Sequence, residues 1–365
     1  MTVKEIAFYS PLKPADHPTP SGDRLMARQL IHCLGEAGCS VEIASRLRVF
    51  IKEPDNQAAF AELEHQAELE MQRLRDHWKR NQIPALWFCY HPYYKSPDLI
   101  GPSLCKEFGI PYMTAEASYS QRRATGIWET TQERVLQSIT GAAVNICFTG
   151  RDKAGLREYV PEAQLATLRP FINIDAFCAE PHPPAVPELV TVAMMRSGDK
   201  MKSYEMLASA LSQILDLPWT LSIVGDGPKR DEVYQLFSDF PADRLNWHGQ
   251  LSRDEIAALF ARSSLFVWPG CGEAYGLAYL EAQAAALPVV AFDTAGVPEV
   301  VDSGYSGYLT PVGDVTAYAA VVAKLVMNTQ ERLDLSAKAR LHVHNKHSLA
   351  MASRVLEGLL NEAIA

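Results

Sequence analysis

The fold is decided most clearly by residues 265–291, LFVWPGCGEAYGLAYLEAQAAALPVVA. The apolar segment Leu265–Trp268 predicts a buried strand, and a loop with three glycines follows it. Residues 276–286 predict an apolar helix, and Val289–Ala291 predicts a second strand. A strand, a helix and a strand of these lengths indicate a βαβ unit with parallel strands.

The same alternation of strands and helices extends over both halves of the chain. In the second half it predicts strands at Leu189–Met194, Thr220–Val224 and Leu245–His248, and helices at 203–215, 228–238, 253–262 and 314–327. In the first half it predicts strands at Ile6–Tyr9, Val41–Ala44, Ala85–Cys89, Pro111–Thr114 and Val144–Phe148, and helices at Gly22–Ala37, 56–80, 97–108 and 126–139. We therefore expect an α/β protein with doubly wound parallel sheets.

A proline-rich segment, EPHPPAVP at Glu180–Pro187, separates the two halves. Its prolines cannot continue a helix or a central strand. We predict a Rossmann-like domain over residues 1–180, a second one over 188–345, and a C-terminal helix at 346–365 that crosses back to the first. Two such domains would face a central cleft at the carboxyl ends of their strands, where ligands bind in open α/β sheets.

Composition excludes several classes of protein. The 365 residues are 48% hydrophobic and 21% charged, as in a globular enzyme, and the net charge of −9 disfavours nucleic acid as the main partner. No apolar run reaches the roughly 20 residues that span a bilayer, and no signal-peptide pattern opens the chain. Seven scattered cysteines without a CxxC pair indicate thiols in a reducing cytoplasm and no zinc site.

The charge is uneven along the chain. Residues 1–180 carry a net charge of −2 and the remainder −7. The less acidic first half is either an ordinary solvated surface or a half that meets an anionic or membrane-borne partner.

The glycine loop within residues 269–282, PGCGEAYGLAYLEA, carries the most informative chemistry. The backbone amides of Tyr275, Gly276 and Leu277 are expected at a helix N-terminus, where a phosphate is favoured by hydrogen bonds and by the helix dipole. Glu273 and Glu281 are eight positions apart and roughly share a side of the element, so they can hold ligand hydroxyls at two points. The alternative is that both carboxylates are surface charges.

At this segment the sequence resembles the GT-B glycosyltransferases, and specifically the retaining glycosyltransferase family 4, the group 1 glycosyl transferases. The family signature is two glutamates separated by seven residues in a frame ending in P-V-V-A. The resemblance implies that Glu273 contacts sugar hydroxyls, that Glu281 contacts the ribose, and that residues from Ala274 onward bind the diphosphate. Gly270, Tyr275 and Ala286 replace the usual Ser, Phe and Gly.

The run VAMMRSGDKMKSY, residues 192–204, resembles the strand and basic turn of the same family. The resemblance implies that Arg196 and Lys202 are cations on the pyrophosphate, with Lys200 competing with Lys202 for this role. Two cations at the end of a strand suit a diphosphate leaving group. The alternative is a pair of surface cations at a turn.

Two further segments of the second half agree with the resemblance. LSIVGDGP, residues 221–228, resembles the family's strand and turn and implies that Gly225 lies at the donor site; taken alone it is a good turn. WHGQ, residues 247–250, places Gln250 where the family's next loop approaches the nucleotide base.

The first half supplies three candidates. TPSGDR, Thr19–Arg24, resembles the family's glycine loop, so Gly22 is expected near the donor. His91 and Glu116 each follow a predicted strand, and the family often carries a His where this chain has Glu116. Either side chain could act on an acceptor hydroxyl, Glu116 as its base. The alternatives are a core or surface histidine and a surface carboxylate.

The resemblance implies a retaining glycosyltransferase that uses a nucleoside-diphosphate sugar, most readily UDP- or GDP-linked, without a metal or other cofactor. It implies a carbohydrate or glycolipid acceptor in bacterial envelope polysaccharide or glycoconjugate synthesis, and a cytoplasmic protein. A peripheral contact with the inner face of the membrane through the first domain is left open. The catalytic candidates are then Glu273, Arg196, Lys202, His91 and Glu116.

Two alternatives remain open at this point. One is a nucleotide-sugar-binding protein of the same fold without transferase activity. The other is a Rossmann-type oxidoreductase, which would need Gly-x-Gly-x-x-Gly after the first strand. The chain has SPLKPADHPTPSGD there, which disfavours the oxidoreductase.

Overall fold

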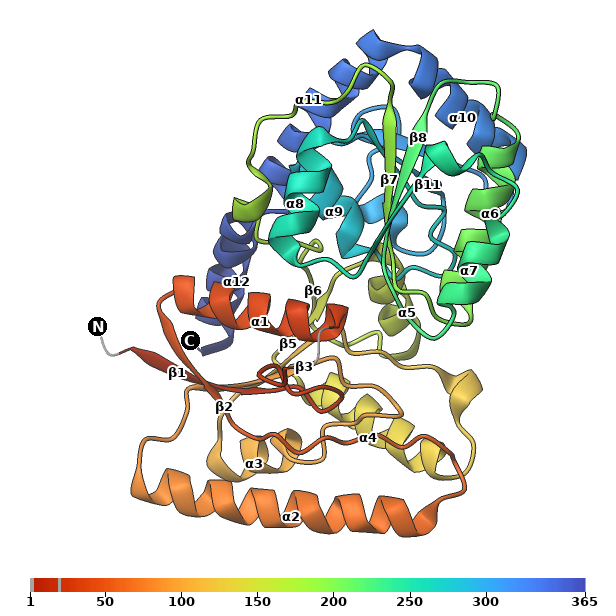
Figure 1. The fold of residues 1–365 in the computed structure, drawn as a ribbon. Helices are drawn as coiled ribbons and strands as arrows, with labels where there is room; N and C mark the ends of the chain where they lie inside the picture. Colours follow the sequence, from red (N-terminus) through yellow and green to blue (C-terminus); the bar gives the residue numbers. More distant parts are fainter. Residues whose placement is uncertain (1–2, 19–20, 365) are drawn as a thin grey trace. The chain divides into compact units, whose positions relative to one another are not determined.

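The computed structural model describes residues 3–18 and 21–364, which form two α/β units (Figure 1). The first unit runs to Arg169 and takes up the chain again from Leu349, and the second is Pro170–Ser348. Each unit is built on one six-stranded sheet in which neighbouring strands are parallel. The predicted pair of doubly wound α/β domains is confirmed.

The first unit has the strand order β2-β1-β3-β4-β5-β6. Its strands are β1 (Lys4–Tyr9), β2 (Cys39–Ile43), β3 (Leu86–Tyr90), β4 (Tyr112–Ala115), β5 (Val144–Cys147) and β6 (Leu165–Thr167). Its helices are α1 (Gly22–Glu36), α2 (Gln57–Arg80), α3 (Gly101–Phe108), α4 (Ile127–Gly141), α5 (Gly150–Tyr159) and α12 (Leu349–Ile364), with a 3₁₀ turn at Gln121–Arg123. The order reverses between β1 and β3, so a ligand crevice is expected at the carboxyl ends of these two strands.

The second unit has the order β12-β11-β10-β7-β8-β9. Its strands are β7 (Glu188–Val192), β8 (Thr220–Val224), β9 (Leu245–Gly249), β10 (Leu265–Val267), β11 (Val289–Phe292) and β12 (Gly307–Thr310). Its helices are α6 (Asp199–Ser212), α7 (Arg230–Leu236), α8 (Arg253–Arg262), α9 (Leu277–Ala284), α10 (Val315–Met327) and α11 (Thr329–Lys346), with 3₁₀ turns at Asp175–Phe177, Ala242–Arg244 and Val297–Glu299. Here the reversal lies between β7 and β10.

The division between the units lies before the proline-rich segment that the sequence pointed to. The stretch after Pro170 packs in the second unit, where Ile172 is buried and pairs with Ser348, and the ring of Phe177 lies 6.1 Å from that of Phe260. The prolines follow later, and the amide of His182 donates to Ala261 O at 2.8 Å. Buried apolar side chains therefore set the division, and the prolines form a surface connection within the second unit.

The last helix belongs to the first unit. Helix α12 packs beside α1 (Figure 1), and Lys4 Nζ donates to Asn361 Oδ1 at 3.2 Å. The apolar side that buries Leu356 and Leu360 supplies the packing.

Four elements were not predicted: β6, α5, β12 and α11. The two strands, Leu-Ala-Thr and Gly-Tyr-Leu-Thr, are only partly buried, so they lack the continuous apolar run that reveals β10 and the other short central strands. Helix α11 is long, but its apolar and charged residues are spread around the axis, so its sequence lacks an amphipathic stripe.

A buried carboxylate organises the core of the first unit. Asp98 Oδ1 accepts hydrogen bonds from the amides of Ile100 and Gly101, at 2.9 and 2.8 Å, at the start of α3. Its Oδ2 accepts from Trp87 Nε1 at 2.9 Å and from the Tyr112 hydroxyl at 3.1 Å. One side chain thus ties α3 to strands β3 and β4.

We expect Asp98→Asn to destabilise the first unit by about 2 kcal/mol, because the new amide N–H₂ would face the indole N–H of Trp87, a donor that cannot turn away. Urea unfolding followed by tryptophan fluorescence measures the change. Asp55→Asn, at an exposed loop position, is the matched control and should lie within about 0.5 kcal/mol of wild type. Equal midpoints for the two variants would contradict this role of Asp98.

Candidate functional site

The loop between β10 and α9 is fixed by the side chain of Tyr279. The Tyr279 hydroxyl is buried and donates to Trp268 O at 3.1 Å. A Cβ on Gly270 would lie 2.0 Å from this hydroxyl, and a Cβ on Gly276 would lie 2.6 Å from the ring. Both glycines have positive φ values, 74° and 75°, so only glycine fits them without strain. The loop therefore packs directly against the Tyr279 side chain, and its path sets where α9 begins.

Helix α9 begins at Leu277, with Gly276 as its N-cap and without a side-chain cap. The first amides of a helix have no acceptor within the helix itself. The predicted set from Ala274 to Leu277 thus lies at a helix start, as the sequence indicated, with Ala274 exposed and Tyr275 buried. An anion placed there meets backbone N–H groups and the positive end of the helix dipole.

Glu273 lies in this loop beside a lysine. Its Oε1 accepts a hydrogen bond from Trp268 Nε1 at 3.1 Å and forms an ion pair with Lys200 Nζ. The Lys200 ammonium also lies 5.4 Å from the centre of the Trp268 ring. With 16% of its side chain exposed, Glu273 is held in one orientation while remaining accessible.

Of the two competing lysines, Lys200 is the one that the structure places on Glu273. Lys202 and Arg196 are both exposed. Lys200 is the second residue of α6, so the start of that helix sets the direction of its side chain.

Arg196 follows β7, and its neighbour Met195 makes two backbone hydrogen bonds. The Met195 amide donates to Asp226 O at 3.0 Å, and the Lys229 amide donates to Met195 O at 2.9 Å. The role predicted for Lys202 stays a prediction.

The backbone segments that follow β7, β8 and β9 lie in close contact with one another. A Cβ on Gly225 would lie 1.9 Å from Ala193 O, so the chain at this turn passes directly against the end of β7. The Gly225 amide donates to Gly249 O at 2.8 Å, and Gln250 follows there as an exposed residue. Gly225 thus has a steric role next to the Arg196 segment, whereas within residues 3–18 and 21–364 no side-chain hydrogen bond or ion pair involves Gln250.

Glu281 lies inside α9 and meets a different cation. Its Oε1 is 3.8 Å from Arg253 Nε, and 15% of its side chain is exposed. Burial raises the pKa of Glu281 to about 7, and Arg253 opposes part of this rise. The two glutamates of the sequence motif therefore differ: one is paired with lysine and indole, and the other is a buried carboxyl near its titration point.

In the first unit, His91 and Glu116 take the same unusual backbone conformation. His91 follows β3 and Glu116 follows β4, with φ values of 60° and 55°. Positive φ is uncommon for residues other than glycine and costs of order 1 kcal/mol or more. The amides still continue the sheet, since His91 N donates to Ala115 O at 2.8 Å and Glu116 N to Ile146 O at 2.9 Å. Two adjacent parallel strands thus end in strained, polar residues, which is typical of functional sites.

These side chains belong to one charged cluster. His91 Nδ1 lies 3.4 Å from Asp23 Oδ1, and Asp23 also forms an ion pair with Lys13. The Tyr90 hydroxyl donates to Glu116 Oε2 at 2.7 Å. The cluster lies where β1 and β3 end, at the reversal of strand order.

Burial and neighbouring charges set the protonation of this cluster. Burial alone would lower the pKa of His91, but the Asp23 and Glu116 carboxylates outweigh it and the pKa is raised. Burial would raise the pKa of Asp23, but His91 and Lys13 hold it well below its ordinary value. Burial raises the pKa of Glu116, against the opposing effects of His91 and Tyr90. The arrangement thus favours the charged form of the His91 imidazole and the neutral form of the Glu116 carboxyl, relative to the same side chains in water.

Sequence reasoning missed Asp23, Lys13 and Arg253. Asp23 stands next to Gly22 in the segment TPSGDR, for which the sequence predicts a donor contact at the glycine. The structure gives Gly22 an ordinary place, as the first residue of α1 behind the Ser21 N-cap with no atom within 4 Å of an added Cβ. Thr19 and Pro20 of the same segment lie outside the described residues. An aspartate in the first helical turn after the first strand was the available signal for Asp23.

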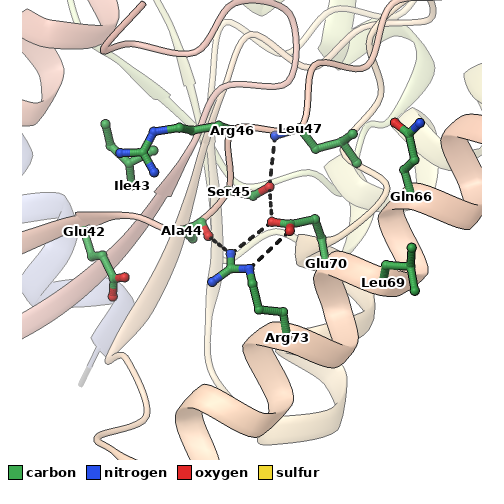
Figure 2. A pocket seen from close by; sticks show the side chains of 10 residues that line it. All are labelled: Glu42, Ile43, Ala44, Ser45, Arg46, Leu47, Gln66, Leu69, Glu70 and Arg73. Atoms are coloured by element: carbon green, nitrogen blue, oxygen red, sulfur yellow. Dashed lines mark hydrogen bonds and ion pairs between the residues drawn. The ribbon is translucent and has the colours of Figure 1, made fainter.

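A pocket of ≈ 510 Å³ lies elsewhere in the first unit, between the end of β2 and helix α2 (Figure 2). Its walls include Ser45, Glu70 and Arg73, and none of the residues predicted from the sequence lines it. Figure 2 shows these polar groups turned toward one another: Ser45 Oγ donates to Glu70 Oε2 at 2.6 Å, and Arg73 Nη2 donates to Glu70 Oε2 at 2.9 Å. This network joins helix to strand, and its charges are engaged with each other.

The described residues contain neither a membrane-spanning helix nor a cluster of metal-binding side chains. Over 3–18 and 21–364, no helix is long and apolar enough to cross a membrane. Within the same ranges, no three His, Cys, Asp or Glu side chains are grouped closely enough to hold a metal ion. The expectation of a reaction without a metal stays a prediction.

Comparison with protein families gives a match to the second unit. Residues 186–328 match the family described as Glycosyl transferases group 1. The chain is 31% identical over 142 residues to the sulfoquinovosyl transferase SQD2 of Arabidopsis thaliana, covering 38% of this chain and 27% of that protein. It is 31% identical over 149 residues to the N-acetyl-alpha-D-glucosaminyl L-malate synthase of Bacillus anthracis, covering 40% of this chain and 39% of that protein. The matched segments thus span well under half of these relatives.

Solved structures resemble the whole chain. Sucrose-phosphate synthase from Thermosynechococcus elongatus superposes with a TM-score of 0.77 at 19% identity, over 98% of both chains. Anabaena Alr3699/HepE in complex with UDP and glucose superposes with a TM-score of 0.68 at 15% identity, over 98% of this chain and 99% of that one. At these identities the likeness concerns the fold, which is the GT-B pair of domains that the sequence resemblance implied.

We expect Asp23→Asn to lower the pKa of the His91 imidazole, because it removes the carboxylate that favours the charged ring. NMR titration of the ring, assigned with His91→Gln, measures the shift. Asp16→Asn is the matched control, since Asp16 pairs with Arg46 at the surface and should leave the titration unchanged. An identical His91 titration in Asp23→Asn and wild type would contradict the pairing.

Proposed function

We propose that this chain, whose residues 186–328 match the group 1 glycosyl transferases, is a glycosyltransferase that moves a sugar from a nucleoside-diphosphate sugar to an acceptor hydroxyl. The observation that carries the proposal is the start of α9. A glycine loop, backbone amides, Lys200 and Glu273 meet there within the segment that matches the family. This combination offers donors for a diphosphate and an acceptor for sugar hydroxyls.

The diphosphate would bind at the amides of the α9 N-terminus. Lys200 carries three N–H donors, so it can hold a phosphate oxygen while it keeps its contact with Glu273. Arg196, exposed after β7, can reach a second phosphate oxygen. As the bond between sugar and phosphate breaks, negative charge grows on the leaving diphosphate, and these cations and amides stabilise it without a metal.

Glu273 would accept hydrogen bonds from hydroxyls of the donor sugar. Trp268 and Lys200 fix its carboxylate, so its remaining acceptor positions are already oriented. Glu281 has its own partner, Arg253, and would accept from the ribose. We propose a retaining reaction, as the resemblance to the retaining glycosyltransferase family implies.

The first unit would hold the acceptor. Glu116 and His91 follow adjacent strands, and the Glu116 carboxylate can accept the proton of an attacking hydroxyl. A carboxyl with a raised pKa suits a general base or a hydrogen-bond donor near neutral pH. The alternative of a binding protein without transferase activity is decided by turnover, as tested below.

We further propose a UDP- or GDP-linked donor and a carbohydrate or glycolipid acceptor of the bacterial envelope, handled in the cytoplasm or at the inner face of the membrane. Support for the nucleotides comes from similar proteins: Alr3699/HepE is in complex with UDP and glucose, and a relative in Mycobacterium tuberculosis, 30% identical over 200 residues, is a GDP-mannose-dependent mannosyltransferase.

A thermal-shift screen with UDP-, GDP-, ADP- and TDP-sugars tests donor binding. A ligand at about 100 times its dissociation constant adds about 2.7 kcal/mol of stability, which raises the melting temperature by a few degrees. We expect a rise with the UDP or GDP series. No shift with any of the four series would contradict the proposed donor class.

Glu273→Gln tests the enzymatic role. We expect hydrolysis or transfer of the preferred donor to fall by about 100-fold or more, because the amide replaces one acceptor oxygen with a donor and loses Lys200. Glu205→Gln, an exposed position on α6, is the matched control and should keep wild-type turnover. Donor binding with background turnover in both wild type and Glu273→Gln, over a panel of acceptors, would favour the binding protein instead.

A further inference from the structure

Arg253 begins helix α8, and its guanidinium faces the Glu281 carboxylate. The Arg253 Nε is buried and has no hydrogen-bond partner among the described residues. The Glu281 Oε1 is 3.8 Å away, within ion-pair range but beyond a hydrogen bond. A buried guanidinium N–H directed at a nearby carboxylate can complete the bond with a small movement of Glu281.

Arg253 is held in this position by contacts that do not involve Glu281. Its guanidinium lies 5.0 Å from the centre of the Phe177 ring, and its Nη2 donates to the backbone oxygen of Asn173. A capping box between Ser252 and Glu255 fixes the backbone from which it projects. The ordering of this long side chain is therefore complete before any ligand arrives.

Glu281 requires such a partner. Burial favours its neutral form and raises its pKa to about 7, and among the described residues Arg253 is the charged group that lowers it. A protonated carboxyl uses one oxygen as a donor, whereas the carboxylate offers both oxygens as acceptors. The vicinal hydroxyls of a ribose present two donors side by side, and only the ionised form offers each of them its own proton-free oxygen.

We infer that Arg253 is a positioning residue that keeps Glu281 ionised and oriented to accept both ribose hydroxyls, and that this pair makes the site specific for ribonucleotides. The inference rests on the proposed function, because it assigns Glu281 to the nucleotide ribose. It adds a residue outside the two-glutamate motif, and it makes nucleotide affinity depend on pH.

The test is calorimetric titration of the full chain with UDP or GDP, whichever base gives the larger thermal shift, between pH 6 and pH 9. Wild-type affinity should weaken as the pH falls through about 7, because Glu281 takes up a proton. Arg253→Met should bind about tenfold more weakly at pH 7 and approach wild type at pH 9, where the carboxyl ionises without help.

Two variants separate positioning from a general structural effect. Arg253→Lys keeps the charge and should stay closer to the wild-type pH profile than Arg253→Met. Arg262→Met, at the exposed end of the same helix, should leave the profile unchanged. In a Glu281→Gln background, Arg253→Met should cause no further loss, because the group on which it acts is gone.

The ligand provides a second control. With the 2′-deoxy nucleotide one ribose donor is missing, so the difference between wild type and Arg253→Met should shrink. A loss in Arg253→Met that is equal at all pH values and persists in Glu281→Gln would overturn the inference, as would unchanged binding throughout. Wild type that binds no nucleotide would instead overturn the proposed function.

Discussion

The contact between the glycine loop and the buried ring of Tyr279 is the constraint on which the candidate site depends. Gly270 and Gly276 leave no room for a Cβ, so the loop between β10 and α9 runs directly over this ring. That path sets where α9 begins, and it brings Glu273 to Trp268 and Lys200. The amides and the carboxylate are thus placed by packing in the core, which makes the site rigid before a ligand binds.

A second theme is that three of the candidate carboxylates lie beside cations. Lys200 accompanies Glu273, Arg253 accompanies Glu281, and in the first unit Lys13 and His91 accompany Asp23. A chain with a net charge of −9 can therefore accept an anionic ligand, since the charges that a ligand meets are local. The two glutamates are about equally exposed, with 16% and 15% of their side chains accessible, and they differ in their partners. Glu273 has an ion pair and an indole hydrogen bond, whereas burial raises the pKa of Glu281 to about 7.

Much of the fold and part of the site follow from the sequence, for identifiable reasons. Apolar segments such as Leu265–Val267 are buried on both sides in a parallel sheet, so they stand out as continuous runs, and the loop from Pro269 to Gly276 is recognisable from its glycines. The partners of these residues could not be predicted in the same way. Arg253 reaches Glu281 only because η2, at Asp175–Phe177, packs on α8, and no spacing in the sequence encodes that contact. That Lys200 pairs with Glu273 depends on the residue at which α6 begins, a boundary that sequence patterns define poorly.

The account makes one central claim, that a nucleoside diphosphate binds at the start of α9. Amide hydrogen exchange of the full chain, measured with and without the preferred nucleoside diphosphate, tests it most directly. We expect exchange to slow most strongly in Gly270–Leu277, where backbone amides would become hydrogen-bonded to phosphate. Protection confined to other segments, such as the Glu42–Leu47 wall of the pocket in Figure 2, would contradict the claim.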